Sequence, residues 1–358
     1  MNSAKPKRSR VTINDVAKEV GLSASTAADA FTRPSKLSED TVQRILAAGK
    51  KLGYERRPYA KQTRQPVYCY LMPHSGEEHD GTAEWWAKEL MSLQQAAFRT
   101  GGQVVGIASE LDREDSEIAA FESMWALRQV KGFILSDGRL KGTDRRHDWL
   151  LENKVPFVQH GRGSSGSPYN WLDLHDEEAT KRLTEQLILK GHRYIAFLGR
   201  NDTNPDGPDI HRLQGYQVAM EVARLDDRQR QLFVPANGEV VKFGDFATQV
   251  EGLVADQIDG EGPSAIVCGS DAIALGVQKA LFKSARSDEP VLTGIDDAAA
   301  RRTSVVPFAS AGIDWSKWGN KMIGLMQQAI AYPGTHYDDL LNHDLVDLEA
   351  IEIRHSGA

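Results

Sequence analysis

The stretch that decides how this chain is organised is TINDVAKEVGLSASTAADAF, residues 12–31. Thr12 and Asp15 have the spacing of a helix N-cap and its N3 partner, and apolar residues then recur on one helical face. Gly21 can end this helix, and Ser23 can cap a second one after a short turn. The pattern therefore predicts two short helices in helix-turn-helix geometry.

A third helix is expected to start at Ser38 and stop at Gly53, because apolar residues again recur at helical spacing. These positions are Val42, Ile45, Leu46 and Leu52. Three short helices around one small core would hold the second helix outward. Capped helix pairs are common, so this pattern alone leaves a plain helical hairpin open.

Charge is distributed unevenly along the 358 residues. Residues 1–65 hold 14 Lys and Arg against 6 Asp and Glu, a net charge of +8. The remainder holds 29 against 44, a net charge of −15. A basic head on an acidic body predicts a module that binds a polyanion, joined to a larger part that does not.

Targeting segments and metal motifs are not expected. The first residues, MNSAKPKRSRV, lack the apolar core of a secretory signal, and no window approaches 18 consecutive apolar residues. The two cysteines, Cys69 and Cys268, lie in apolar runs without metal-ligand spacing, which predicts reduced core residues. We therefore expect a cytoplasmic protein with no membrane partner, metal or cofactor.

From residue 66 the chain alternates short apolar runs with amphipathic stretches. The runs expected to form buried strands are VYCYLM, GQVVGIAS, VKGFILS, VPFVQH, YIAFLG, AIVCGS and VLTGID. Residues 176–190 and 271–285 are expected to be helical. This alternation predicts a doubly wound α/β body behind the all-α head.

These segments together resemble the lactose-repressor (LacI/GalR) family of transcriptional regulators. In the head the resemblance continues through LSEDTVQRILAAGKKLGYERRPYAKQTR. In the body it is carried by LDLHDEEATKRLTEQLILKGHRYIAFLG, HRLQGYQVAM, SAIVCGSDAIALGVQKAL and VLTGIDDA. It implies a homodimeric repressor that binds near-palindromic operator DNA and a small-molecule effector, without catalytic residues.

The resemblance also implies a division into domains. Residues 1–53 would be the helix-turn-helix head, 54–65 a hinge helix and 66–358 a two-subdomain body of periplasmic-binding-protein type. The subdomains would comprise about 66–162 with 298–325, and 163–297 with 326–358. The chain would thus cross between them near 162, 297 and 325.

Family members read base edges from the start of the second helix, which here offers Ala24, Ser25 and Asp29. Asp29 departs from the family, where Arg is frequent. A carboxylate has no donor and suits the cytosine amino group, so Asp29 is expected to select bases while nearby cations supply affinity. The alternative is a local ion pair with Arg33.

YERRPYAKQTR, residues 54–64, corresponds to the family's hinge, which enters the minor groove. Thr63 stands where a leucine wedge is usual, so DNA would be kinked less or differently. The predicted DNA-binding residues are Thr12, Ser23, Ala24, Ser25, Thr26, Asp29, Arg33, Tyr54, Arg57, Ala60, Lys61, Thr63 and Arg64.

For the effector, the matching motifs place Arg212 and Asp296 in a cleft between the subdomains, where they suit sugar hydroxyls or the polar edge of a base. Ser270 replaces the usual Asn before Asp271, which leaves ligand identity open. The other predicted effector residues are Asp137, Asp173, Trp85, Trp86 and Trp315. Indole rings favour a carbohydrate, although each could equally be core.

Two rival classes of protein fit the sequence less well. GRGSSG, residues 161–166, fits a dinucleotide-binding enzyme in letters, but it leads into SPYNW and not into a helix pattern. A solute-binding receptor would need a signal peptide and no DNA-binding head. We therefore expect a regulator and not an enzyme.

Overall fold

The computed structural model describes residues 11–32, 36–52, 54, 65–74, 82–110, 114–136, 144–163, 166–200, 207–225, 230–234, 263–284 and 290–352. The chain divides into two compact units, Met1–Gln65 and Pro66–Ala358, called the head and the body below.

The head contains α1 (Ile13–Val20), α2 (Ala24–Thr32) and α3 (Glu39–Leu52). Thr12 caps α1, because its backbone N and its Oγ1 donate to Asp15 Oδ2 over 2.8 and 2.7 Å. Gly21 follows with φ 70°, a left-handed conformation that glycine adopts without strain. The three predicted helices are confirmed.

The core of the head is small and apolar. Its fully or nearly fully buried side chains are Val16, Ala17, Ala27, Ala30, Ile45 and Ala48. Leu46, expected to pack inward, is instead exposed, because it follows Ile45 on α3 and lies on the adjacent face.

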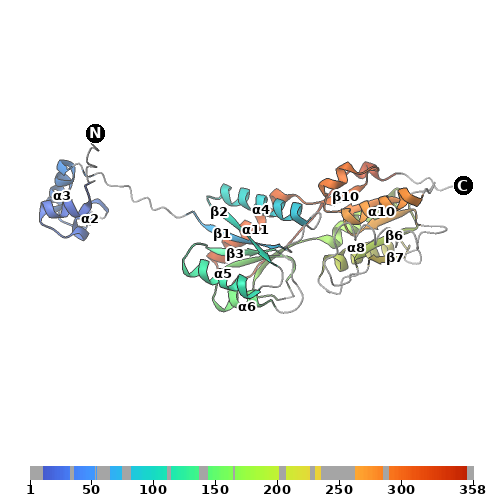
Figure 1. The fold of residues 1–358 in the computed structure, drawn as a ribbon, viewed down its shortest axis with the longest axis horizontal. Coiled ribbons are helices and arrows are strands. Elements are labelled where there is room, and N and C mark those ends of the chain that lie inside the picture. The colour runs from blue at the N-terminus through green and yellow to red at the C-terminus, as the bar shows by residue number, and fades with distance from the viewer. Residues whose placement is uncertain are drawn as a thin grey trace, which may run out of the picture. The chain divides into compact units, whose positions relative to one another are not determined.

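The body holds two six-stranded sheets (Figure 1). The first has the order β11-β5-β4-β3-β1-β2, and every pair in it is parallel. Its strands are β1 (Val67–His74), β2 (Gln103–Glu110), β3 (Gly132–Leu135), β4 (Phe157–His160), β5 (Asn170–Leu174) and β11 (Asp338–Leu341).

The second sheet has the order β12-β10-β9-β8-β6-β7. Its strands are β6 (Ile195–Arg200), β7 (Arg230–Val234), β8 (Ala265–Cys268), β9 (Val291–Ile295), β10 (Ala309–Gly312) and β12 (Asp344–Val346). Only β12 is antiparallel to its neighbour. Each strand predicted from an apolar run is present, and the predicted α/β body is confirmed.

Helices cover both faces of each sheet, as buried parallel sheets require. The first sheet packs against α4 (Thr82–Arg99) and α11 (Trp315–Ala331) on one face, and α5 (Glu114–Ala126) and α6 (Arg145–Glu152) on the other. The second packs against α7 (Asp176–Leu189) and α8 (Pro208–Val222), and opposite them α10 (Asp271–Ser284). We call the first sheet with its helices the first lobe, and the second with its helices the second lobe.

The chain crosses between the lobes at His175, at Ile313–Asp314 and at Asn342–His343. The expected crossings near 162, 297 and 325 are wrong. The first two were placed too early because β5 still pairs within the first sheet, and β10 within the second. The third was too early because α11 continues past 325 and β11 rejoins the first sheet.

Cys69 and Cys268 are fully buried free thiols, as expected of core residues. GRGSSG is followed by β5 as the next described element, so a phosphate-binding helix does not open there. In the described part of the chain, the helices lack the length and apolar character that crossing a bilayer demands.

Candidate functional site

Arg212, on α8, is the centre of a buried polar cluster in the second lobe. Its Nη1 donates to the carbonyl oxygen of Gly269 over 2.7 Å, and its Nη2 to Asp176 Oδ1 over 3.3 Å. Nη2 also lies 3.7 Å from Asp296 Oδ1. Burial disfavours the charge, but Asp176 and Asp296 outweigh it and raise the pKa of Arg212. Motif matching thus selected two residues, Arg212 and Asp296, that the fold brings together.

Asp296 follows β9 in a backbone conformation that side chains rarely adopt. Its φ is 106°, and Asp297 follows with φ 45°. Such strain persists where surrounding contacts hold it, here a hydrogen bond from Asp296 N to Ala311 O of 2.9 Å. Burial raises the pKa of Asp296 to about 6, although Arg212 opposes the rise. The carboxyl is therefore held at the carboxyl end of a strand, and it titrates near neutral pH.

Asp176 was not predicted as a site residue. It opens α7, is 4% exposed and lies 3.1 Å from Nε2 of His343. Burial opposes its ionisation, but Arg212 and His343 outweigh burial and lower its pKa to about 2. Because His343 is 167 residues away in sequence, no local pattern could have indicated the pair.

Asp173, at the end of β5, lies on the first-lobe side of this cluster. Its Oδ2 is 3.8 Å from Nε of Arg162. Burial and the neighbouring Asp176 raise its pKa, against an opposing effect of His160. Residues of both lobes therefore meet at the carboxyl ends of their strands, the usual ligand position in such sheets.

A second buried hydrogen-bond network, which the sequence does not predict, lies in the first lobe. Glu89 on α4 is fully buried and accepts hydrogen bonds from Tyr70 OH and, over 3.0 Å, from Ser136 Oγ. His160 Nδ1 is in close contact with the same carboxylate. Burial and Glu89 raise the pKa of Tyr70, so its hydroxyl stays protonated and donates. This network fixes His160 at the end of β4.

Two of the three predicted tryptophans come together above His160. Trp85 and Trp315 pack edge to face with ring centroids 4.9 Å apart, and Trp85 stacks on His160 at 6.3 Å with an interplanar angle of 8°. Both indoles are half-buried and also contact the first-lobe core. Trp86 is half-buried, but the described contacts do not join it to this group.

Ser270 and Asp271 have structural contacts instead of an open position. Ser270 Oγ accepts from the backbone N of Ile273 over 3.3 Å at the start of α10. Asp271 is fully buried and accepts from Ser310 Oγ and from the backbone N of Ala298, both over 2.7 Å. Burial and Asp296 raise its pKa to about 7. Both side chains are buried, and Asp137 lies outside the described residues.

One contact joins the lobes beside the tryptophans. The backbone N of Ala299 donates to Glu84 Oε1 and Oε2 over 3.2 and 3.3 Å. Glu84 lies on α4 of the first lobe, and Ala299 opens the 3-10 helix η3 (Ala299–Thr303) of the second. Movement of one lobe relative to the other would stretch or break this hydrogen bond.

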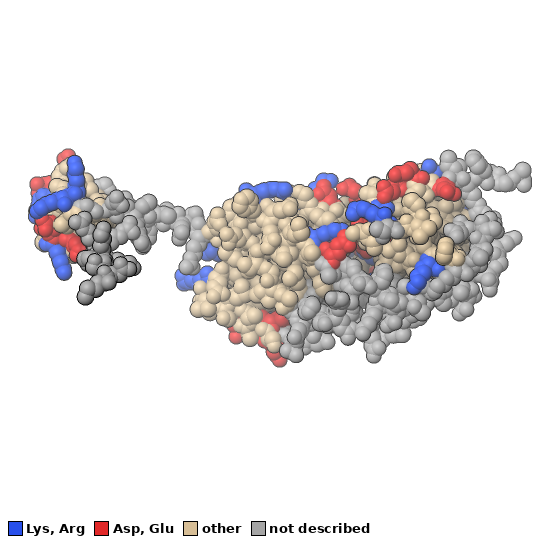
Figure 2. Space-filling model, turned by 45° about the horizontal axis from the view of Figure 1, so that its top comes forward, with Lys and Arg blue, Asp and Glu red and all other residues tan. Residues whose placement is uncertain are grey.

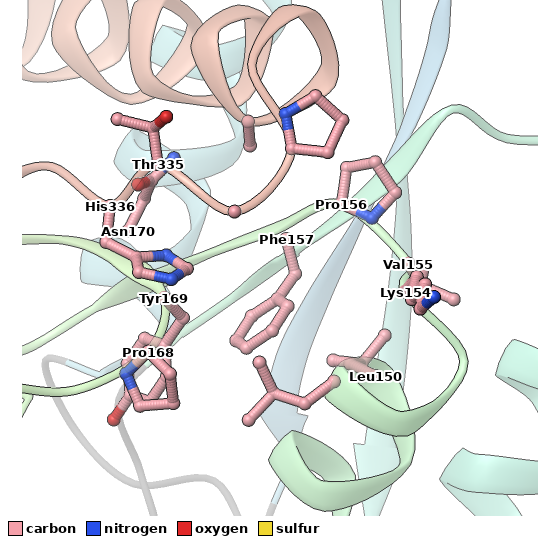
Figure 3. A pocket seen from close by; sticks show the side chains of 14 residues that line it. Leu150, Lys154, Val155, Pro156, Phe157, Pro168, Tyr169, Asn170, Thr335 and His336 are labelled. Atoms are coloured by element: carbon pink, nitrogen blue, oxygen red, sulfur yellow. The ribbon is translucent and has the colours of Figure 1, made fainter.

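A pocket of about 440 Å³ lies elsewhere in the first lobe (Figure 3). Its walls include Pro156, Phe157 and Asn170, at the amino ends of β4 and β5, with Tyr169 and Leu150. Asp173 and His160 stand at the opposite, carboxyl ends of these strands. The pocket is therefore separate from the cluster around Arg212.

In the head, Ser23 Oγ accepts from the backbone N of Thr26 over 3.1 Å, and the two hydroxyls are 2.8 Å apart. These side chains, like that of Thr12, cap helices, which limits what they can offer DNA. Ser25 is exposed on α2, whereas Ala24 and Asp29 are half-buried.

Tyr54 packs against Phe31 with ring centroids 5.4 Å apart and so belongs to the head core. The remaining predicted DNA-binding residues lie outside the described part of the chain; they are Arg33, Arg57, Ala60, Lys61, Thr63 and Arg64. Among the described residues, no group of three or more His, Cys, Asp or Glu side chains could hold a metal ion.

Known proteins resemble both units. Residues 12–57 match the family described as bacterial regulatory proteins, lacI family, and residues 184–347 match the periplasmic binding protein-like domain. The maltose regulon regulatory protein MalI of Escherichia coli (strain K12) is 23% identical over 347 residues, 93% of this chain and 96% of that protein. GalR of Salmonella typhimurium (strain LT2) is 25% identical over 299 residues, 81% of each chain.

Solved structures agree in fold. The CelR–cellobiose complex has a TM-score of 0.61 at 20% identity, covering 94% of this chain and 98% of that one. The lac repressor dimer bound to operator and the anti-inducer ONPF has a TM-score of 0.64 at 19% identity, covering 96% and 100%.

A helix-turn-helix head and a two-sheet body of this type define a DNA-binding transcriptional regulator, and the relatives are regulators and not enzymes. The head carries the DNA-binding domain of the lacI family, the body carries a periplasmic binding protein-like domain, and the relatives are LacI/GalR-family regulators.

Proposed function

We propose that this regulator is a repressor whose affinity for operator DNA is controlled by a carbohydrate bound between the lobes. The observation that carries the proposal is that carboxylates of both lobes lie at the carboxyl ends of their strands. Asp173 of the first lobe neighbours Asp176 and His160, on which Trp85 stacks, and Asp296 of the second lobe lies 3.7 Å from Arg212. Carboxylates accept hydrogen bonds from paired hydroxyls, and an indole face stacks on the C–H surface of a sugar ring.

The relatives support a sugar without naming it. CelR was solved with cellobiose, and another LacI-family regulator of similar fold was solved with ribose. Arg212, Asp296, Asp173, Trp85 and Trp315 are the residues we assign to the effector. Ligand binding would rotate the lobes about the three crossings and couple to DNA binding by at most about 3 kcal/mol.

A homodimer is the proposed DNA-binding state. On α4, Met91 and Phe98 are 58% and 80% exposed one above the other, and the adjacent edge strand β2 exposes Val105. Figure 2 shows few charged side chains on this side of the first lobe. An apolar helix face beside an open strand edge suits a self-complementary contact about a two-fold axis. Phe98→Lys should then shift the chain to monomer in analytical ultracentrifugation, whereas Leu189→Lys, an equally exposed site, should not.

On DNA, the dimer would place each α2 in a major-groove half-site, with Ala24, Ser25 and Asp29 nearest the bases. Residues 54–64 would form the hinge near the symmetry axis and add phosphate contacts through Arg57, Lys61 and Arg64. Deleting residues 1–65 should abolish binding to duplexes selected by the full chain.

The effector proposal is tested by a thermal-shift screen of the full chain against mono- and disaccharides, since a ligand of the folded state raises its melting temperature. Arg212→Ala and Asp296→Ala should remove any shift, while Lys190→Ala, just after α7 and away from the cluster, should retain it. If a purine shifts the protein and no sugar does, the carbohydrate assignment is wrong. Adding the sugar to the operator complex then distinguishes release from corepression.

A further inference from the structure

Arg212 is the natural receptor for an anionic ligand, but protein groups already occupy its guanidinium. Gly269 O accepts from Nη1, and Asp176 Oδ1 lies 3.3 Å from both Nη2 and Nε. A carboxylate or phosphate needs two parallel N–H groups of the fork for bidentate binding. Asp176 Oδ1 lies in front of the Nε and Nη2 edge, although only Nη2 donates a hydrogen bond to it, so a ligand anion would have to displace this carboxylate.

The other cations near the cluster are also matched. Arg162 Nε lies 3.8 Å from Asp173 Oδ2. The charge of Arg200, at the end of β6, favours the ionised form of Asp296 and so lowers its pKa. Asp209 accepts from the backbone N of Arg200 over 3.4 Å. The described residues thus provide four carboxylates, of Asp173, Asp176, Asp209 and Asp296, together with three arginines and the imidazoles of His160 and His343. Each arginine already lies near one of these carboxylates, so an anionic ligand that approached a guanidinium would also approach a carboxylate.

The side chains of the cluster differ in how much surface they offer to a ligand. The side chains of Asp296 and Asp173 are 26% and 18% exposed, whereas those of Arg212 and Asp176 are 10% and 5% exposed. The side chain of Arg162 is 21% exposed, but its Nε lies 3.8 Å from Asp173 Oδ2, so an anion bound there would be close to that carboxylate. The side chains of the two lobes that are most open to a ligand are therefore mainly hydrogen-bond acceptors.

We infer that the effector is a polyhydroxylated ligand without negative charge, and that Asp176 is the specificity-determining residue that excludes anionic analogues. The inference rests on the carbohydrate effector proposed above. Burial already raises the pKa of Asp296, so a further anion beside it would be repelled, whereas a donated hydroxyl proton would stabilise the carboxylate.

Matched sugars that differ only in charge test the inference on the full chain. Glucose, galactose and mannose are each compared with the corresponding amino sugar, uronate and 6-phosphate, by tryptophan fluorescence and calorimetry. For any series that binds, the neutral or amino sugar should bind at least about tenfold more tightly than the uronate and the phosphate.

Asp176→Asn keeps the shape of the side chain and removes its charge. In this variant the affinities for the uronate and for the neutral sugar should differ by no more than about threefold, because Arg212 becomes available to the anion. Glu178→Gln is the matched control: it removes a charge from the same turn of α7, where Glu178 pairs with Lys181 at the surface. The ratio should stay unchanged in this control.

Each outcome has its own consequence. If a uronate or phosphate binds wild-type protein as tightly as the neutral sugar, the inference is overturned while a carbohydrate effector stands. If no sugar of any charge binds, the carbohydrate proposal and this inference both fail. The affinity ratio of the wild-type protein decides between these outcomes by itself, even if Asp176→Asn does not fold.

Discussion

His343 Nε2 lies 3.1 Å from Asp176 Oδ1, and this contact ties the first and third crossings between the lobes. Next to it, His175 Nδ1 is 3.0 Å from Asn342 Oδ1, and His175 N donates to Leu341 O over 2.9 Å. Asp176 also contacts Arg212, so one buried carboxylate joins the crossings to the proposed effector site. A ligand that shifts Arg212 would thereby act on the segments about which the lobes turn.

Replacing His343 by Leu should destabilise the body by about 2 kcal/mol, because leucine has no donor and the buried carboxylate of Asp176 loses a hydrogen bond. All seven tryptophans lie in the body, so tryptophan fluorescence in urea measures its unfolding. His175→Leu, which removes the more exposed contact with Asn342, should cost no more than about 0.5 kcal/mol. Equal losses in the two variants would show that the buried pair has no special role.

Gly215 sets how closely α8 approaches α7. A Cβ there would overlap the carbonyl oxygen of Glu177 and lie 2.9 Å from the backbone N of Lys181. Gly215→Ala must therefore push the helices apart and should cost about 3 kcal/mol or more. It should also weaken effector binding, because α7 carries Asp176 and α8 carries Arg212.

Gly324, inside α11, is the matched control, since a Cβ there meets nothing within 4 Å. Gly324→Ala should raise the free energy of unfolding by about 0.5–1 kcal/mol, because alanine loses less backbone entropy in a helix. If Gly215→Ala is as stable as wild type, the close packing of α7 and α8 does not limit the fold.

Asp271 makes the stability of the body depend on pH. Its pKa is about 7 in the folded state against about 3.9 when unfolded, so between these values the folded state binds more protons. Stability therefore falls as pH rises from about 4 to about 7. Asp271→Asn removes this contribution, so its free energy of unfolding relative to wild type should rise by about 3 kcal/mol over the same range.

Urea unfolding of both proteins at several pH values measures this difference. Asp338→Asn alters an exposed aspartate and should leave the pH dependence as in wild type. A difference that is flat between about pH 4 and 7 for Asp271→Asn would contradict a raised pKa.

Sequence periodicity located the strands that are continuously apolar and missed those that are not. β5, NWLDL, alternates buried and half-buried residues, β10 is ASAG, and β11 is DDLL, so none has a run of large apolar side chains. Because β5 and β10 were missed, the predicted crossings fell too early. The resemblance nevertheless places Asp173 and Asp296 among the effector residues, because its motifs are local in sequence.

The contacts that assemble the site could not be predicted in the same way. Glu89, His160 and His343 come from α4, β4 and a crossing segment, and no short motif contains two of them. Their roles depend on tertiary burial, which pairs Glu89 with His160 and His343 with Asp176. Conversely, Asp271 matches a motif, with Ser270 in place of the usual Asn before it, but the two side chains accept hydrogen bonds from backbone N–H groups at the starts of α10 and η3.

Asp29, on α2 one turn after Ser25, is predicted to select a base and not to add affinity. Its carboxylate suits the N4 amino group of cytosine, and it repels phosphate. In duplexes selected from a random pool by the full chain, Asp29→Ala should relax preference for cytosine at one position of each half-site by about tenfold. Binding to unrelated duplexes should tighten slightly, because a negative charge is gone.

Asp40→Ala makes the same charge change at the exposed start of α3, so it should reproduce the tighter nonspecific binding but keep the cytosine preference. If the two variants behave alike, Asp29 acts only through its charge, and the base must be read by other residues of α2.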